Sequence, residues 1–345
     1  MSGTAHGPVQ TTQIRLAARP VGEPQDSDFE TVTTDLPELQ DGQVLLEVLH
    51  LSLDPYMRGR MSSAKSYADP LEVGDVVIGG TVCEVLESRS ESRSPGDVVL
   101  AFCGWQTHAV VHARHTRRLD TSLAPPSTAL GVLGMPGFTA YAGLLEIGQP
   151  QAGETVVTAA ATGPVGSAVG QIARIKGARA VGIAGGEEKC RLLTEHFGFD
   201  EAVDHRAPDF KERLAAATPD GVDVYFENVG GPVTEQVTRR LNKFARIPVC
   251  GLVSQYNATE APEGPDRLPG FMNRVLVLSL RIRGFIQDEF LPTHQEAFQE
   301  EMGPWVRDGR VRYLEHRVAG LANAPQAFRD LLAGRNVGKV VVDVG

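Results

Sequence analysis

Residues 155–171 read TVVTAAATGPVGSAVGQ, and they decide the fold class. The first six are β-branched or apolar without a break, which is typical of a strand covered on both faces. A glycine-rich turn follows, and apolar residues then recur at helical spacing. α/β proteins bind dinucleotides with such a unit, because N–H groups at the helix start face an anion and glycine lets a pyrophosphate approach.

The turn departs from the usual dinucleotide pattern at one position. It has the form A-x-x-G-x-x-G, in which Ala160 stands in place of the first glycine and Gly163 and Gly166 follow. The motif is therefore only moderately specific by itself. A glycine-rich turn that binds nothing is the alternative interpretation.

The next predicted strand indicates which dinucleotide binds. Residues 180–184 are followed by Gly185 and Gly186, where an NAD site usually has an Asp or Glu that bonds the ribose 2′-hydroxyl. Without that acid a 2′-phosphate is not repelled, and Lys189 on the next helix can pair with it. We therefore expect NADPH rather than NADH as the cofactor. The alternative is that Lys189 is an ordinary solvated helix residue.

Length and composition indicate a two-domain globular protein. The chain has 345 residues, of which 42% are hydrophobic and 22% charged. The net charge of −10 argues against nucleic acids and anionic membranes as partners. No apolar run is long enough to span a bilayer. Residues 1–12 are polar and lack a signal-peptide core, so we expect a flexible tail and a cytoplasmic location.

Cysteine and histidine spacing predicts no metal site. His108 and His112 would be ligands at i, i+4 spacing only on a helix, but the apolar residues between them indicate a strand. The cysteines are scattered, form no C-x-x-C motif and are expected to be reduced and mostly buried. They are Cys83, Cys103, Cys190 and Cys250.

The pattern of elements predicts an α/β fold with two kinds of architecture. Residues 13–135 contain short strands, one of them at 76–85, and form a β-rich, partly closed domain. Residues 136–290 alternate strand and helix, with 275–286 as the last element, which predicts a doubly wound parallel (Rossmann) sheet. Residues 259–270 form a Pro/Gly/Asp/Glu loop beside the expected site, where it can act as a lid.

Six segments, in order over nearly the whole chain, resemble the medium-chain dehydrogenase/reductase superfamily. Within it they are similar to the zinc-independent NADPH double-bond reductases, the branch of prostaglandin reductase, leukotriene 12-hydroxydehydrogenase and alkenal reductase. The segments are LDPYMR (53–58), LGMPGFTAY (133–141), AATGPVGSAVGQ (160–171), YFENVGG (225–231), CGLVSQYN (250–257) and NVGK (336–339).

The resemblance implies a domain division and a set of site residues. It implies a GroES-like catalytic domain from 13–135 and 315–345, an NADP-binding Rossmann domain from 136–314, and a homodimer. Lys189 would bind the 2′-phosphate. Where the family usually has a tyrosine near that phosphate, this chain has His205 and Arg206, either of which can replace its hydrogen bond. The pyrophosphate residues would be Gly163, Pro164, Val165 and Gly166, and the nicotinamide side would be lined by Asn228, Cys250, Gly251, Tyr256, Phe285, Ile286 and Asn336.

The implied chemistry is hydride transfer to an activated C=C bond without a metal. Ser52-Leu53-Asp54 and residues 78–81 stand where a zinc alcohol dehydrogenase of this superfamily needs a Cys ligand and a Gly-His-Glu stretch. Hydride at the β-carbon of an α,β-unsaturated aldehyde or ketone produces an enolate. Tyr256 or Tyr56 can donate to its oxygen or deliver a proton; packing is the alternative role for each.

Two other functions stay open. The first is a quinone reductase of the same superfamily, which would also lack zinc. The second is a non-catalytic NADPH-binding or structural protein. Beside Tyr56, Met57 and Arg58 are expected to make packing and surface contacts.

Overall fold

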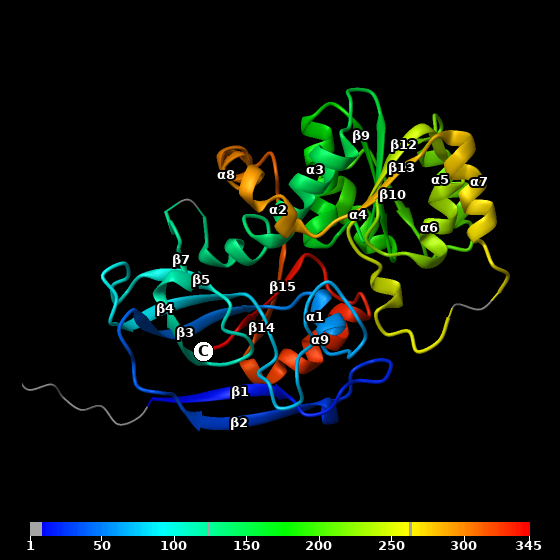
Figure 1. Cartoon of the computed structure of the whole chain (residues 1–345). Helices are drawn as coiled ribbons and strands as arrows, with labels where there is room; N and C mark the ends of the chain where they lie inside the picture. Colours follow the sequence, from blue (N-terminus) through cyan, green and yellow to red (C-terminus); the bar gives the residue numbers. More distant parts are fainter. Residues whose placement is uncertain (1–8, 123, 262–263) are drawn as a thin grey trace, which may run out of the picture. The chain divides into compact units, whose positions relative to one another are not determined.

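The computed structural model describes residues 9–122, 124–261 and 264–345 (Figure 1). The described chain forms two compact units. The first unit is Met1–Leu130, Glu315–Asn336 and Val340–Gly345, and the second unit is Gly131–Leu314 with Val337–Lys339. Residues 131–135 and 337–339 therefore belong to the second unit, whereas the division predicted from the sequence placed them in the GroES-like domain.

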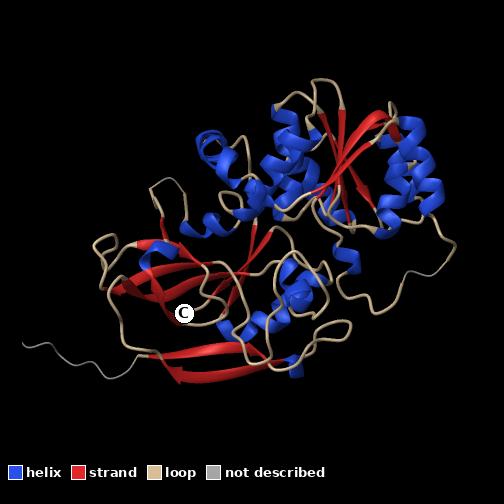
Figure 2. Cartoon of the chain, viewed as in Figure 1, coloured by secondary structure: helices blue, strands red, loops and turns tan. Residues whose placement is uncertain are grey.

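The second unit contains a six-stranded parallel sheet, so the predicted doubly wound Rossmann sheet is confirmed (Figure 2). Every strand pairing for which a register is given is parallel. The chain starts in the middle of the sheet at β8, builds outward to β10, and then returns to build from β11 to β13. In spatial order the strands are β10 (Glu201–Asp204), β9 (Arg179–Ala184), β8 (Thr155–Ala159), β11 (Val222–Phe226), β12 (Leu241–Val249) and β13 (Arg281–Gly284).

Helices cover both faces of this sheet (Figure 1). Adjacent residues of β8 point to opposite faces of the sheet and belong to different hydrophobic cores. Val156 packs with the helices on one face, called the first set below, and Val157 packs with the helices on the other face, the second set. All five residues of β8 are buried, as its apolar sequence predicts. The first set is α2 (Met135–Ala142), α3 (Pro164–Ile175), α4 (Glu187–Glu195) and α8 (Leu291–Arg307), and the second is α5 (Phe210–Ala217), α6 (Gly231–Thr238) and α7 (Leu268–Leu278).

The first unit is built on a sheet whose registered pairings are antiparallel. Its longest strand, β3, pairs with β4 on one edge and with both β6 and β15 on the other, so the C-terminal strand returns to the N-terminal part of the chain. The strands are β3 (Gln43–Ser52), β4 (Thr81–Ser88), β5 (Val98–Ala101), β6 (His108–His112), β7 (Arg117–Arg118), β14 (Glu315–Ala319) and β15 (Lys339–Asp343). A separate pair is β1 (Gln10–Leu16) with β2 (Phe29–Asp35), and the helices are α1 (Tyr56–Arg60) and α9 (Ala324–Leu332).

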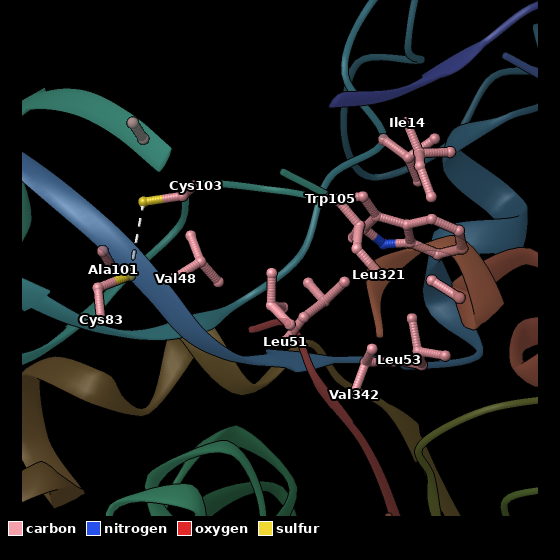
Figure 3. Close-up of a cluster of buried hydrophobic side chains, with 14 of the residues drawn as sticks. Ile14, Val48, Leu51, Leu53, Cys83, Ala101, Cys103, Trp105, Leu321 and Val342 are labelled. Atoms are coloured by element: carbon pink, nitrogen blue, oxygen red, sulfur yellow. Dashed lines mark hydrogen bonds between the residues drawn. The ribbon is translucent and has the colours of Figure 1, made fainter. Parts of the chain in front are cut away.

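The core of the first unit is centred on Trp105, which is fully buried (Figure 3). Its ring stacks on Phe29 and meets Phe328 of α9 edge-on, both at a centroid distance of 5.7 Å. In the same core, Cys83 and Cys103 are buried with their Sγ atoms 3.9 Å apart. These two cysteines are scattered only in sequence. The four cysteines are free thiols, and the other two are half-buried.

Two of the elements predicted from the sequence have wrong boundaries. The strand expected at 76–85 begins at Thr81, because Val76 and Val77 pair with the β1 strand instead and Gly79-Gly80 separates the two stretches. The element expected at 275–286 is the end of α7 followed by β13, divided by Ser279 in a left-handed conformation with φ +51°. A continuous apolar run does not reveal such a break.

The predicted terminal tail and lid are also shorter than expected. β1 begins at Gln10, so the last three residues of the tail expected at 1–12 are strand, and residues 1–8 lie outside the described residues. α7 begins at Leu268, which makes the end of the predicted 259–270 loop helical. Residues 262–263 of that loop are outside the described residues. In the described part of the chain, no helix has the length and apolar character needed to cross a membrane.

Candidate dinucleotide site

The glycine turn after β8 leaves the start of α3 open to an anion. Gly163 is the N-cap residue, and no side chain caps this end. Pro164 has no N–H, and the first intrahelical bond is donated by the Ser167 N–H to the Gly163 oxygen at 2.9 Å. The N–H groups of Val165 and Gly166 therefore lie in the first turn, where the helix itself supplies no acceptor. Such N–H groups and the helix dipole favour a phosphate.

Gly166 and Ala160 of this turn are constrained in different ways, Gly166 by space and Ala160 by backbone conformation. A Cβ on Gly166 would lie 2.6 Å from the Ala160 oxygen and 2.7 Å from the Ala161 Cα, so α3 packs directly on the backbone of the turn. Ala160 has φ +50°, the left-handed conformation for which glycine is the usual residue. The missing first glycine of the motif is therefore replaced by an alanine held in glycine's conformation.

A group of basic side chains lies at the end of β9. A Cβ on Gly185 would be 2.8 Å from Arg206 Nε and 2.9 Å from His205 Nε2, so both side chains lie against this glycine. They come from the end of the neighbouring strand β10. The Asp204 carboxylate fixes this arrangement, because its Oδ1 accepts the N–H of Gly186 and the N–H of Arg206, each at 2.8 Å.

Lys189 on α4 belongs to the same group electrostatically. Burial lowers the pKa of Lys189, and the charge of Arg206 lowers it further, against Glu188. Burial also lowers the pKa of His205, with Arg206 and Lys189 adding to the effect against Asp204. The positive charges of Lys189 and Arg206 repel each other, and an anion relieves that repulsion, so this basic group suits a phosphate.

Asn228 spans the point where the strand order reverses. It follows β11, and its Nδ2 donates to the Ala159 oxygen of β8 at 2.9 Å and lies 3.4 Å from Thr158 Oγ1. Ligands of open α/β sheets bind at this switch point, outside the carboxyl ends of the strands. Asn228 is therefore held at the edge where a dinucleotide would cross the sheet.

The loop after β12 brings Tyr256 to the same edge. The Tyr256 N–H donates to the Val253 oxygen at 3.3 Å, which folds the loop back on itself. A Cβ on Gly251 would lie 3.1 Å from the Tyr256 hydroxyl, so that hydroxyl lies over the end of β12. Burial, together with the charge of Glu227, raises the pKa of the neighbouring Cys250 thiol to about 12. Cys250 is thus a neutral thiol and not a nucleophile.

The remaining predicted site residues have other surroundings. The Phe285 side chain is buried in the core, 6.2 Å from the Phe226 ring and 6.0 Å from the Phe290 ring between centroids. It can present only backbone to a ligand, and Ile286 follows it half-buried. The Gly338 N–H donates to the Thr162 oxygen at 2.9 Å, which brings Val337–Lys339 beside the glycine turn within the second unit.

Asn336, Tyr56 and Arg58 belong to the first unit. Tyr56 begins α1 and packs against the Trp105 core. The expectation that Arg58 makes surface contacts is wrong. Arg58 is only 6% exposed, and its guanidinium donates to the oxygens of Pro20 and Gly22 at 3.2 and 2.9 Å. Arg58 thus ties α1 to the chain after β1.

One buried carboxylate of the site was missed by sequence reasoning. Glu227 directly follows β11 and is 2% exposed. Its Oε1 accepts the N–H groups of Val229 and Gly230 at 2.7 and 2.9 Å, and its Oε2 accepts the hydroxyl of Thr234. The signal was an acid between an apolar strand and a pair of glycines, which is an unusual place for an unpaired charge.

Comparisons with known proteins identify the family. A family described as the N-terminal domain of oxidoreductase matches residues 12–119, and one described as zinc-binding dehydrogenase matches residues 164–303. Over 329 residues the chain is 53% identical to the NADPH-dependent curcumin reductase of Escherichia coli (strain K12), and 95% of each chain is covered. The chain belongs to the medium-chain dehydrogenase/reductases, in their zinc-independent branch.

Two further relatives resemble this oxidoreductase over nearly its whole length. It is 38% identical to the 2-alkenal reductase (NADP(+)-dependent) of Nicotiana tabacum, with 97% of this chain and 98% of the relative covered. The crystal structure of CurA from Vibrio vulnificus in complex with NADPH superimposes with a TM-score of 0.93 at 50% identity, covering 97% of this chain and 99% of that one.

The described residues of this reductase contain no metal-binding group. Within the ranges that the structure describes, no three His, Cys, Asp or Glu side chains gather so as to hold a metal ion. In the first unit Ser52 donates its hydroxyl to the Asp54 carboxylate, and both residues are buried. That a metal plays no part in the reaction stays a prediction, tested below.

Ala160→Gly is expected to stabilise the reductase. Glycine adopts the positive φ of this position without strain, and the gain, less the added freedom of the unfolded chain, is up to about 1 kcal/mol in the free energy of unfolding. Denaturant unfolding of the cofactor-free protein measures it. Ala161→Gly is the matched control and should destabilise, because Ala161 is buried and has no positive φ. A less stable Ala160→Gly variant would contradict the strain argument.

Proposed function

We propose that this reductase uses NADPH to reduce the C=C bond of α,β-unsaturated aldehydes and ketones, without a metal. One observation carries the proposal: the edge of the sheet has a basic, anion-binding part at one strand end and a phenol and an amide at others. Lys189, His205 and Arg206 form the basic part, and Tyr256 and Asn228 the other. The names of the relatives support both the cofactor and the class of substrate.

The basic group accounts for a preference for NADPH over NADH. The start of α3, from Gly163 to Gly166, binds the pyrophosphate. His205 and Arg206 beside Gly185, together with Lys189 on α4, bind the 2′-phosphate. An NAD site has an acid at the end of the corresponding strand, and this chain has Gly185 and Gly186 there. The observed surroundings of Lys189, His205 and Arg206 fit a phosphate that carries two negative charges.

The protein's own part in the reaction is orientation and proton donation. Bound NADPH supplies the hydride that adds to the β-carbon of the substrate. The Tyr256 hydroxyl donates a hydrogen bond to the carbonyl oxygen, on which negative charge develops. It then gives its proton to the α-carbon, which completes the saturated product, and the phenolate regains a proton from solvent. Asn228 and the backbone of Cys250 and Gly251 line the nicotinamide side and orient it. Tyr56 is the second candidate for the proton donor.

A substrate screen tests the function. NADPH oxidation is measured with short alkenals, long hydroxyalkenals, phenyl-substituted enones and quinones, and we expect turnover with the enals or enones. Naphthoquinone turnover far above enone turnover would support the quinone reductase alternative. Tight NADPH binding without oxidation in any arm would support a non-catalytic protein.

Lys189→Ala is expected to narrow the preference for NADPH. Loss of a charge-assisted bond to the 2′-phosphate should lower NADPH affinity roughly tenfold to a hundredfold and leave NADH affinity unchanged. Fluorescence titration with each cofactor measures both values. Lys243→Ala, at the amino end of β12, is the control and should change neither. Equal affinity of the wild type for the two cofactors would contradict the assignment.

Tyr256→Phe keeps the ring and removes only the hydroxyl. Turnover with an enone should fall by roughly 10- to 1000-fold, the range for one general acid or oxyanion donor. NADPH affinity should change little, because the phosphates bind to α3 and the basic group. The comparison requires conditions in which hydride transfer limits the rate. Wild-type turnover of the variant would make Tyr256 a packing residue and Tyr56 the next donor to test.

Metal removal should leave the activity intact. Dialysis against EDTA is expected to change neither turnover nor NADPH affinity, since no described group of ligands suits zinc. Elemental analysis of the purified protein should find no stoichiometric zinc. One zinc ion per chain, or loss of activity that added zinc restores, would contradict a metal-free mechanism.

A second copy of the chain fits the β13 edge of the parallel sheet. β13 is the last strand in that sheet, and all four of its residues are exposed. A two-fold axis at such an edge pairs the strand with its copy and covers neighbouring apolar side chains.

Light scattering should therefore give the mass of two chains for the wild type. The double variant Met272→Glu, Leu276→Glu should give the mass of one chain, and a monomeric wild type would contradict the dimer. The exposed apolar residues of α7 are Leu268, Met272, Leu276 and Val277, each more than half exposed.

A further inference from the structure

Glu227 is a buried carboxylate whose hydrogen-bond partners are neutral groups. It directly follows β11 at the switch point, and among the described residues no Lys, Arg or His forms an ion pair with it. Backbone N–H groups of Val229 and Gly230 and the hydroxyl of Thr234 satisfy its two oxygens instead. Burying a charge is costly unless such donors compensate it. A small apolar residue at position 227 would avoid the cost of burying a carboxylate, so the presence of Glu227 calls for an explanation.

The carboxylate holds a tight turn in one conformation. The chain between Glu227 and α6 passes through Gly230 and Gly231, whose φ angles are +79° and +62°. The two donated N–H groups wind this turn around Glu227 Oε1. Thr234 ties Oε2 to the first turns of α6, whose dipole also favours a negative charge at this end. The conformation of the turn, and with it the direction of the Asn228 side chain, depends on the carboxylate.

The turn in turn holds the loop that carries Tyr256. The N–H groups of Cys250 and Gly251 donate to the main-chain carbonyl oxygen of Glu227 at 2.9 and 3.2 Å. Further along, the Val253 N–H donates to the main-chain oxygen of Asn228 at 3.2 Å. The N–H and the hydroxyl of Ser254 both donate to the main-chain oxygen of Val229, at 3.0 and 2.6 Å. These hydrogen bonds end at Ser254, two residues before Tyr256, whose hydroxyl lies over Gly251.

We propose that Glu227 is a positioning residue for the nicotinamide side of the site. Its carboxylate fixes the 228–230 turn, and through that turn it aligns the Asn228 amide and the Tyr256 hydroxyl. This role rests on the proposed function, since it assigns Asn228 and Tyr256 to the reacting end of the cofactor. The proposal assigns different roles to the two ends of the site. Glu227 acts on the nicotinamide side, whereas Gly163–Gly166 and Lys189 act on the phosphates.

Glu227→Gln tests the role, because the amide keeps the shape but replaces one acceptor oxygen with a donor. Turnover should fall by about tenfold or more, as expected when reacting groups are misplaced by a fraction of an ångström to 1 Å. The dissociation constant of NADPH should change less than threefold. Bound NADPH should also lose part of its emission shift, which reports the order of the nicotinamide without any substrate.

Asp223→Asn is the matched control on the same strand. Asp223 lies at the amino end of β11 and accepts the Thr155 N–H and the Asn242 amide, each at 2.8 Å. Its loss should lower stability but leave turnover and the NADPH emission unchanged. A general effect of removing a carboxylate from β11 would appear in both variants, whereas positioning would appear only at Glu227.

A double variant distinguishes positioning from an independent contribution. If Glu227 acts partly through Tyr256, the turnover losses of Glu227→Gln and Tyr256→Phe combine to less than their product. If Glu227→Gln does not fold, Thr234→Val removes one donor to the carboxylate, and a severalfold loss of turnover that Thr234→Ser restores would support the role.

Three results would overturn the proposal: a folded Glu227→Gln with wild-type turnover and emission, losses that multiply fully with Tyr256→Phe, or a Thr234→Val variant without effect. A wild type that binds NADPH but reduces no substrate would refute the proposed function instead. In that case the emission of bound NADPH in Glu227→Gln still decides whether this carboxylate orders the nicotinamide.

Discussion

The reversal of strand order between β8 and β11 is the constraint on which the site depends. Each parallel strand must be reached by a crossover, and crossovers of the same hand place their helices on opposite faces once the direction of building reverses. At the reversal the loops after β8 and β11 therefore diverge, and their backbone groups are left to bind a ligand. Asn228 bridges the two strands at this point. The glycine turn, Glu227 and the β12 loop are all arranged around the same edge.

Close packing explains why small residues gather there. Gly166 has no room for a side chain, because α3 lies on the backbone of the turn that it follows. Gly182 in β9 is similarly restricted: a Cβ there would lie 2.7 Å from Leu193 Cδ1 and 3.0 Å from the Ala161 Cβ. The short distance between helix and strand brings the N-terminus of α3 to the sheet edge, where its N–H groups can reach a pyrophosphate. Ala160 shows that the requirement at its position concerns conformation rather than space.

Charge is distributed locally rather than over the whole molecule. The chain carries a net charge of −10, yet three basic side chains lie together at the end of β9 and β10. Their mutual repulsion is tolerated because Asp204 balances part of it. Two strands away from β9, Glu227 is buried and is satisfied by backbone N–H groups and the Thr234 hydroxyl, with no ion pair to it among the residues that the structure describes. The two parts of the site thus have opposite electrostatic character, as binding a phosphate and orienting a neutral substrate would require.

Local patterns in the sequence determined the fold class and predicted where a dinucleotide would first contact the chain. The apolar run of β8, the glycine turn and the alternation of strands and helices depend on neighbours in the chain, so they predict a Rossmann sheet and an open helix start. The absence of an acid after Ala184 depends only on the neighbouring sequence as well.

Only the tertiary structure decided how distant residues meet. Register between β9 and β10 brings His205 and Arg206 against Gly185, and the return of the chain to β11 and β12 stacks the Glu227 turn on the loop of Tyr256. It also buried Phe285 and Arg58, and placed Cys83 beside Cys103. Such contacts follow from strand pairing and packing across tens of residues, and periodicity within a segment carries no information about them.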